Sequence, residues 1–149
     1  MLLALLLSAC ATMGKDVDPP KISLDGVHSI PGEGGGPRFR MDLRIQNPNQ
    51  QDLDIAGISY GISVQDVELV SGVTNEVPLI EGYSEEVVSL EGGLNTLQLI
   101  RFFTKLGMDQ RSLDRLEYTF EAKIDFHGFT PTQRISESGV IGGPVNRAP

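Results

Sequence analysis

The chain has 149 residues, close to the commonest length for a single domain and long enough to bury one hydrophobic core. Twenty acidic residues against twelve lysines and arginines give a net charge of −8, which argues against nucleic-acid binding and against charge-driven adsorption to anionic lipid. The single cysteine, Cys10, excludes an intrachain disulfide and a zinc site built from cysteines.

The first ten residues predict a secretory signal that ends at Cys10. The apolar run Met1–Leu7 is too short to cross a bilayer, which takes about 20 residues, but it is typical of the apolar part of a signal peptide. Leu7-Ser8-Ala9-Cys10 resembles the lipobox of bacterial lipoproteins. The resemblance implies a signal peptide of residues 1–9, cleavage between Ala9 and Cys10, lipidation of the Cys10 thiol and acylation of the new N-terminus.

The implied anchor predicts a location in the cell envelope, because two or three acyl chains hold a protein durably at a membrane. Ala11 rather than Asp follows Cys10, so the resemblance implies the periplasmic face of the outer membrane in a diderm bacterium. The sequence departs from the usual pattern in one respect. A signal peptide normally begins with Lys or Arg, and here neither precedes Leu2. The alternative interpretation is that these residues form a buried core segment with an incidental cysteine.

The segment that follows is expected to be a tether leading into the first strand. Residues 10–20 are predicted to be flexible, because Pro19-Pro20 and alternating charges resist regular structure. A strand is expected from Lys21 to Ser29. The glycine-rich segment 31–37 resembles a phosphate loop in glycine count alone, since Pro37 occupies the third glycine position of Gly-x-Gly-x-x-Gly. A plain loop between strands is therefore predicted.

The next two strands have the clearest patterns. Arg38–Gln46 alternates apolar with polar residues, which predicts one buried and one wet face, and Asn47-Pro48-Asn49 ends it with a turn. A third strand is expected from Leu53 to Val64, and a change of apolar parity near Ala56-Gly57 predicts a β-bulge. Shorter strands are expected at residues 67–70, 73–79 and 85–90.

One helix interrupts the β pattern, over residues 95–106. Asn95 and Gln98 resemble a capping box, and Gly107 is a natural stop. The predicted inward stripe consists of Leu99, Ile100, Phe103 and Leu106. Beyond it, Leu116–Phe126 alternates almost without fault, a last strand is expected at Thr132–Ile141, and residues 142–149 should form a loose tail.

These elements predict an all-β fold. About seven strands, each apolar on one side, bury those sides by packing as two sheets face to face. The expected architecture is an antiparallel, fibronectin- or immunoglobulin-like β-sandwich with one short helix against an end or edge.

Several short motifs, in this order and spacing, resemble a known family over residues 21–141. They are Asn47-Pro48-Asn49 followed by an alternating strand, Gly72 after a short strand, and Pro78 within Val77-Pro78-Leu79. This arrangement is similar to the water-stress domain of the type 2 late embryogenesis abundant (LEA) proteins. The resemblance implies a fibronectin-like sandwich and, in some members, protection against drying or cold. It implies no catalytic residues.

The sequence predicts no catalytic, cofactor-binding or metal site. The strongest exception is Asp125 with His127, which alternation would place on one wet face of a strand as a carboxylate–imidazole pair. Three functions follow as hypotheses. The first is a non-enzymatic envelope lipoprotein whose sandwich binds or shields other macromolecules, with protection under desiccation or cold stress as the role that the family resemblance implies. The alternative is an interaction module that docks an envelope protein through an edge strand or the 95–106 helix, and the third is a hydrolase or ligand carrier using Asp125 and His127.

Overall fold

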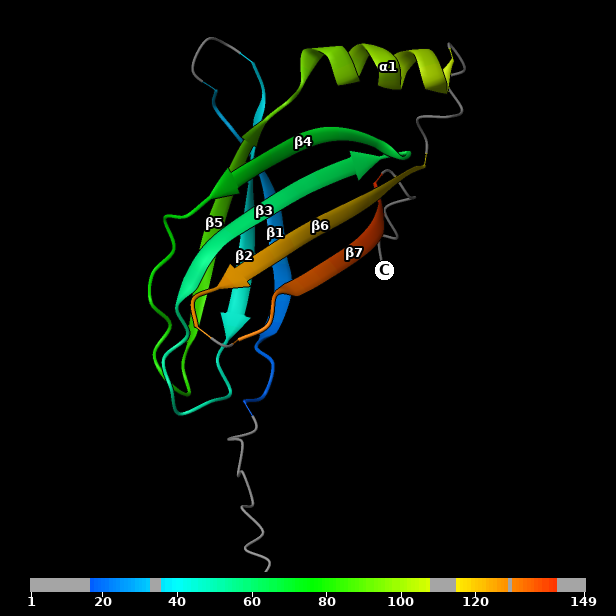
Figure 1. Cartoon of the computed structure of the whole chain (residues 1–149). Helices are drawn as coiled ribbons and strands as arrows, with labels where there is room; N and C mark the ends of the chain where they lie inside the picture. The colour runs from blue at the N-terminus through cyan, green and yellow to red at the C-terminus, as the bar shows by residue number, and fades with distance from the viewer. Residues whose placement is uncertain (1–16, 33–35, 108–114, 129, 142–149) are drawn as a thin grey trace, which may run out of the picture.

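The computed structural model describes residues 17–32, 36–107, 115–128 and 130–141 (Figure 1). The predicted signal peptide, its cleavage point at Ala9 and Cys10, most of the tether and the tail 142–149 lie outside these residues. The elements are β1 (Lys21–Ile30), β2 (Arg38–Gln46), β3 (Ile55–Val64), β4 (Val67–Thr74), β5 (Glu85–Gly93), α1 (Thr96–Leu106), β6 (Leu116–Phe126) and β7 (Gln133–Ile141).

The strands form two antiparallel sheets, in the orders β1-β2-β5 and β4-β3-β6-β7. The two sheets face each other, and α1 lies across one end of the sandwich (Figure 1). The predicted all-β sandwich with one short helix is therefore confirmed. The chain enters β1 at the opposite end from α1, so the two ends of the molecule carry different parts of the sequence.

Strict alternation on the central strands builds the core. Met41, Leu43 and Ile45 of β2 are fully buried, while the residues between them lie on the outer face. Phe120, Ala122 and Ile124 of β6 oppose them from the other sheet, with exposed fractions between 0 and 4%. Apolar burial on both inner faces is what holds the two layers together.

Irregular pairing occurs where the sequence pattern changes parity. The register between β3 and β6 shifts between Ile55 and Gly57, which confirms the predicted bulge. A second shift lies between Leu24 and Gly26 in β1. The predicted start of the third strand was too early, because Leu53 forms an isolated bridge with Ile80 outside β3.

The predicted strands 67–70 and 73–79 were wrong as separate elements. A single strand, β4, runs through Ser71 and Gly72, because β3 pairs with it from Ile58↔Thr74 to Val64↔Val67. Residues 75–79 are not a strand. The predicted strand 85–90 extends to Gly93, because β2 continues to pair with it up to Arg38↔Gly93.

The helix forms where predicted but is rotated. Its buried residue is Phe102, at 5% exposure, whereas Ile100 and Phe103 of the predicted inward stripe are 60% and 57% exposed. Leu99 and Leu106 are partly buried, so the inward side follows Leu99, Phe102 and Leu106. Because the helix lies over the end of the sandwich and contacts β4, one narrow strip is covered and the rest stays in solvent.

Asn95 caps α1 as expected, with its Oδ1 accepting the N–H groups of Leu97 and Gln98. In a capping box the Asn95 N–H would donate to the side chain of Gln98. Here it donates to the Leu69 carbonyl instead, and this bond ties the start of the helix to β4. Gly107 ends the helix at φ 68°.

Candidate functional site

The Asn-Pro-Asn motif closes the end of the sandwich at which the chain enters. Asn47 is 3% exposed, and its Nδ2 lies 2.8 Å from the Gln51 carbonyl oxygen and 3.2 Å from those of Ile80 and Glu81. Its Oδ1 accepts the N–H of Asn49 at 3.0 Å. These contacts join the β2–β3 connection to the β4–β5 connection, so the Asn47 amide has a structural role and is not free to bind a ligand.

Asn49 binds the incoming chain. Its Nδ2 donates to the Asp18 carbonyl at 2.8 Å, and its Oδ1 accepts the Asp18 N–H at 2.9 Å. The Asn49 carbonyl also accepts the N–H of Tyr83. We call Asn47, Pro48, Asn49 and their partners at this end of the sandwich the clasp. It fixes the position of Asp18, just before β1 begins.

Gly72 is required by a cross-strand tyrosine. It pairs with Tyr60 across β3 and β4, and a Cβ added at Gly72 would lie 2.5 Å from the Tyr60 hydroxyl oxygen. That hydroxyl donates to the Glu91 carbonyl at 2.7 Å, so it links the two sheets, and burial raises the pKa of Tyr60. Gly139 and Tyr118 repeat the arrangement on β7 and β6, a pair that sequence reasoning missed. Pro78 is exposed in the non-strand segment after β4.

Asp125 and His127 do not form the pair that the sequence suggested. The Asp125 carboxylate accepts hydrogen bonds from Lys123 Nζ and Thr132 Oγ1, both at 2.6 Å, and these lower its pKa. His127 lies beyond the end of β6 and is exposed, with its backbone N–H donating to the Asp54 carbonyl. The carboxylate is thus engaged in ordinary surface contacts, which gives the hydrolase hypothesis no support.

The other histidine also has a surface role. His28 Nε2 lies 3.2 Å from the Asp42 carboxylate, which additionally accepts the Ser89 hydroxyl at 2.7 Å. Within the described ranges, no three His, Cys, Asp or Glu side chains are grouped closely enough to hold a metal ion. None of the helical residues described forms a segment with the length and apolar character needed to cross a bilayer.

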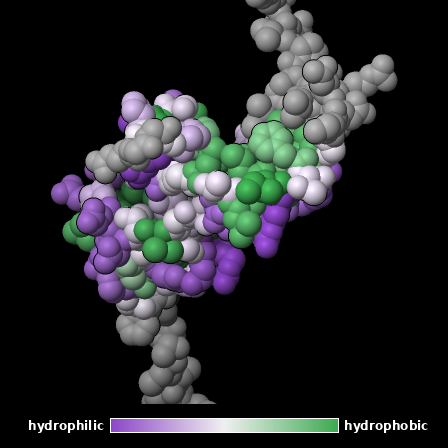
Figure 2. Space-filling view, turned by 90° about the horizontal axis from the view of Figure 1, so that it is seen from above, coloured by the Kyte–Doolittle hydropathy of each residue, from purple (hydrophilic) through white to green (hydrophobic). Residues whose placement is uncertain are grey.

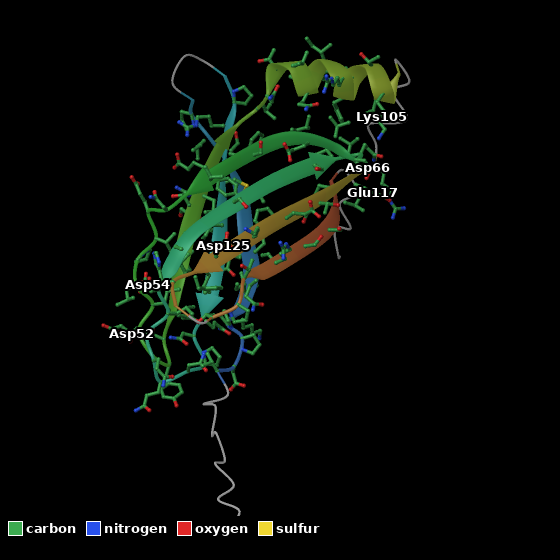
Figure 3. The ribbon with its side chains drawn as sticks, viewed as in Figure 1. Asp52, Asp54, Asp66, Lys105, Glu117 and Asp125 are labelled. Atoms are coloured by element: carbon green, nitrogen blue, oxygen red, sulfur yellow. The ribbon has the colours of Figure 1, made fainter. Side chains whose placement is uncertain are left out.

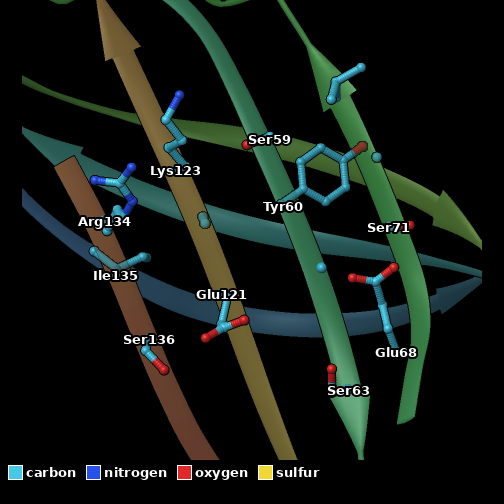
Figure 4. Close-up of a pocket in the computed structure, with 14 residues that line it drawn as sticks. Ser59, Tyr60, Ser63, Glu68, Ser71, Glu121, Lys123, Arg134, Ile135 and Ser136 are labelled. Carbon is cyan, nitrogen blue, oxygen red and sulfur yellow. The ribbon is translucent and has the colours of Figure 1, made fainter. Parts of the chain in front are cut away.

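A polar groove of about 740 Å³ runs over the outer face of the four-stranded sheet (Figure 4). Its floor is β3, which contributes the small residues Ser59, Gly61 and Ser63. The neighbouring strands add hydroxyl groups and charges of both signs, from Glu68, Ser71, Glu121, Lys123, Arg134 and Ser136. The groove is open and polar, so it presents hydrogen-bond donors and acceptors to water or to a polar surface.

The end of the molecule that carries α1 has an apolar surface. Leu97, Ile100 and Phe103 are 60%, 60% and 57% exposed and follow one another at intervals of three residues, so they form a stripe on the solvent side of the helix. Seen from above, hydrophobic side chains gather over this end (Figure 2). We call these three residues the helix stripe, and a contiguous apolar surface of this kind is typical of an interaction site.

Comparisons with known proteins agree with this fold. The family model LEA_2, late embryogenesis abundant protein, matches residues 42–139. The chain has no significant match among curated proteins. A solution structure of a protein from Arabidopsis thaliana is similar, with a TM-score of 0.65 and 15% identity, covering 84% of this chain and 82% of that one.

Two further solved structures share the fold. A crystal structure of a protein from Archaeoglobus fulgidus has a TM-score of 0.57 and 14% identity, covering 80% of this chain and 98% of that one. A solution structure described as a late embryogenesis abundant (LEA) protein has a TM-score of 0.60 and 17% identity, covering 84% and 71%. At these identities the likeness concerns the fold.

Proposed function

The chain belongs to the LEA_2 family of late embryogenesis abundant proteins, and from this membership we propose that it is a lipid-anchored envelope protein whose sandwich shields other macromolecules during drying or cold. The family indicates a stress-protective, non-catalytic role. The match of the family model to residues 42–139 carries the protective part of the proposal. The lipobox-like Leu7-Ser8-Ala9-Cys10 motivates the anchor.

The outer surface supports a shielding role. The polar groove presents hydroxyls and charges of both signs, and the chain carries a net charge of −8. A strongly charged surface keeps a protein soluble as its concentration rises, and that is the situation when water is withdrawn. The groove can then hydrogen-bond to polar groups of a neighbouring protein that have lost their water.

The clasp supports an anchored orientation. Asn49 holds Asp18 at the end of the sandwich opposite α1, and few residues separate Cys10 from that point. An extended residue spans at most about 3.6 Å, so a lipid on Cys10 would keep the clasp near the membrane and direct α1 away from it. The polar groove and the helix stripe would both be accessible from the surrounding compartment.

The anchor is tested by the variant Cys10→Ala, expressed in a diderm bacterium beside the unchanged chain and the control Thr12→Ala. We expect the unchanged chain and the control to carry acyl chains by intact mass and to sediment with the outer membrane. Cys10→Ala should lack the acyl mass. An unchanged chain that keeps residues 1–9 and carries no lipid would refute the anchor.

Protection is tested separately on the purified chain. A dehydrogenase that aggregates on freezing or drying is mixed with the chain, or with an equal mass of an unrelated acidic β-sandwich. We expect light scattering to fall and recovered enzyme activity to rise with this chain alone. Equal effects of the two proteins would mean that acidity suffices, and no effect would refute shielding.

The helix stripe favours a second function, in which the domain docks an envelope protein through α1. The double variant Ile100→Ser with Phe103→Ser removes apolar surface without touching buried Phe102, and Val73→Ser is a matched control because Val73 is 80% exposed on β4. In-cell crosslinking should trap one stoichiometric partner that the double variant loses and the control retains. A diffuse set of products from all three proteins would favour shielding instead.

A further inference from the structure

A second cavity, of about 510 Å³, lies between the two sheets near the α1 end of the sandwich. Its lining is largely apolar and comes from both sheets, including Phe39 of β2, Ile62 and Val64 of β3, Leu69 of β4 and Tyr118 of β6. Ligand pockets commonly have volumes of about 300–1,000 Å³ and apolar walls with a few polar groups. The cavity therefore has the size and chemistry of a small-molecule site.

The cavity opens to solvent beside β1. Val27 pairs directly with Met41 of β2, and directly opposed residues of an antiparallel pair point to the same face. Met41 is fully buried on the inner face, yet Val27 is 42% exposed. The inner face is thus accessible at Val27, next to the register shift between Leu24 and Gly26.

A carboxylate stands at the opening. Glu137 of β7 pairs with fully buried Phe120 of β6, so its side chain also leaves from the inner face. Its Oε1 accepts the Leu24 N–H at 3.0 Å and bridges the edges of the two sheets. The neighbouring Asp25 is neutralised by Arg44, whereas none of the ion pairs between described residues involves Glu137.

We propose that this cavity binds the hydrocarbon chain of an amphiphile whose polar head is uncharged or cationic. The apolar walls take the chain out of water, and the head stays at the opening beside Glu137. A negatively charged head would lie against that carboxylate and be repelled, so the site discriminates against fatty-acid anions. Glu137 also protects the β7 edge from pairing with another chain, as inward-pointing charges do, and the charge experiment below separates the two roles.

Binding is measured with N-phenyl-1-naphthylamine, an uncharged probe that fluoresces in apolar surroundings. Dodecyl maltoside, dodecyltrimethylammonium and dodecanoate, all below their micellar concentrations, then compete for the site with the same chain and different heads. We expect the neutral and cationic compounds to displace the probe at least about fivefold more strongly than dodecanoate, as one unfavourable charge contact implies. Dodecanoate as the best competitor would overturn the proposal.

Location is tested by blocking the opening. Val27→Trp places a large side chain at the accessible inner position. It should weaken probe binding at least about tenfold, because the probe loses apolar contacts with the cavity wall. Val73→Trp makes the same change on an exposed outer position and should bind as the unchanged chain does. Val64→Phe, which fills the cavity from β3, should act like Val27→Trp. Binding that survives both fillings lies elsewhere, for example on the apolar run at the start of the chain, and would refute the site.

Glu137→Gln tests the charge while keeping the hydrogen-bond acceptor for Leu24. Affinity for dodecanoate should rise about fivefold and affinity for dodecyltrimethylammonium should fall, with dodecyl maltoside unchanged. If Glu137 only protects the β7 edge, Glu137→Gln should aggregate more than the unchanged chain. Its affinities for the three dodecyl compounds should then equal those of the unchanged chain. That result would remove the head-group selectivity from the proposal.

Discussion

The two ends of the sandwich are built differently. At the clasp, Asn47 is 3% exposed and donates to three backbone carbonyl groups, and the core beneath it includes the fully buried Ile45 and Ile80. At the α1 end, a cavity separates the sheets, Val27 of the inner face reaches solvent, and the helix stripe is exposed. The end at which the chain enters is therefore closed by hydrogen bonds and buried side chains, whereas the far end leaves apolar side chains accessible to solvent. Binding sites generally sit in such less completely packed regions.

The largest effect is expected from replacing an isoleucine on the inner face of each sheet. Ile45 is fully buried near the clasp, and Ile62 lines the cavity at 8% exposure. Ile45→Ala should lower the free energy of unfolding by about 4 kcal/mol, because it opens a void in close-packed surroundings. Ile62→Ala should cost about 2 kcal/mol, since it enlarges an existing cavity that water or a ligand can fill.

Urea unfolding of both variants beside the unchanged chain measures this difference. Equal losses would show that the α1 end is as tightly packed in solution as the clasp. The comparison between the two ends would then fail, and with it the physical basis for a ligand cavity.

Two asparagines, one at each end of the sandwich, test how much their side-chain hydrogen bonds contribute to stability. Asn47→Ala removes the donor of three carbonyl groups and the acceptor of the Asn49 N–H, which should cost about 3 kcal/mol. Asn95→Ala removes an exposed helix cap at the α1 end and should cost about 1 kcal/mol. Thermal or urea unfolding gives both values, and a larger loss for Asn95 would contradict the assignment of the clasp as the structural end.

The sequence predicts a structural feature well when that feature depends on residues close together in the chain. The strands Arg38–Gln46 and Leu116–Phe126 are predicted with their faces, because alternation is a property of the strand itself. The rotation of α1 is not predictable in this way. Both Leu97-Ile100-Phe103 and Leu99-Phe102-Leu106 are apolar, so contact with β4 decides which side is buried.

The candidate sites were harder to predict for the same reason. The order of Asn47, Gly72 and Pro78 indicated the family, yet the partners of Asn47 come from residues 51, 80 and 81, which no local pattern connects to it. The cavity depends on how far the sheets separate and has no sequence pattern of its own. Glu137 did carry a signal, because it occupies the same parity as Ile135 in β7 and so breaks the apolar side of that strand.

A glycine pair gives a smaller effect. Gly72→Ala would bring its Cβ to 2.5 Å from the Tyr60 hydroxyl oxygen and should cost about 2 kcal/mol through displacement of the ring that links the sheets. A Cβ at Gly36 would meet nothing within 4 Å, so Gly36→Ala should be neutral to within about 0.5 kcal/mol. The difference in melting temperature between the two variants measures this. Two neutral variants would mean that Tyr60 moves freely and does not link the sheets.

The smallest expected effect is the change in stability of the clasp end with pH. Asp125 and Asp54 lie at the clasp end, and Asp66 and Lys105 at the other (Figure 3). Hydrogen bonds from Lys123 and Thr132 lower the pKa of Asp125, and a hydrogen bond from Gln46, at the same end, lowers the pKa of Glu85. A carboxyl group whose folded pKa is depressed contributes stability that is present above the unfolded pKa of about 4 and is lost as the pH falls through the folded value.

Acid should therefore loosen the clasp before it affects the α1 end. Hydrogen exchange at pH 6 and at about pH 3.5, corrected for the intrinsic effect of pH on amide exchange, should show protection lost first at the N–H groups of Asn47, Leu53 and Ile80, which bond across the connections at this end. The Asn95 and Leu99 amides at the start of α1 should change less, because Asp125 and Glu85 lie at the opposite end of the sandwich. Asp125→Asn should reduce the acid sensitivity of the clasp while leaving α1 as it was. Uniform loss of protection over both ends would mean that the sandwich opens as one unit. The difference between the two ends would then depend on the isoleucine and asparagine variants alone.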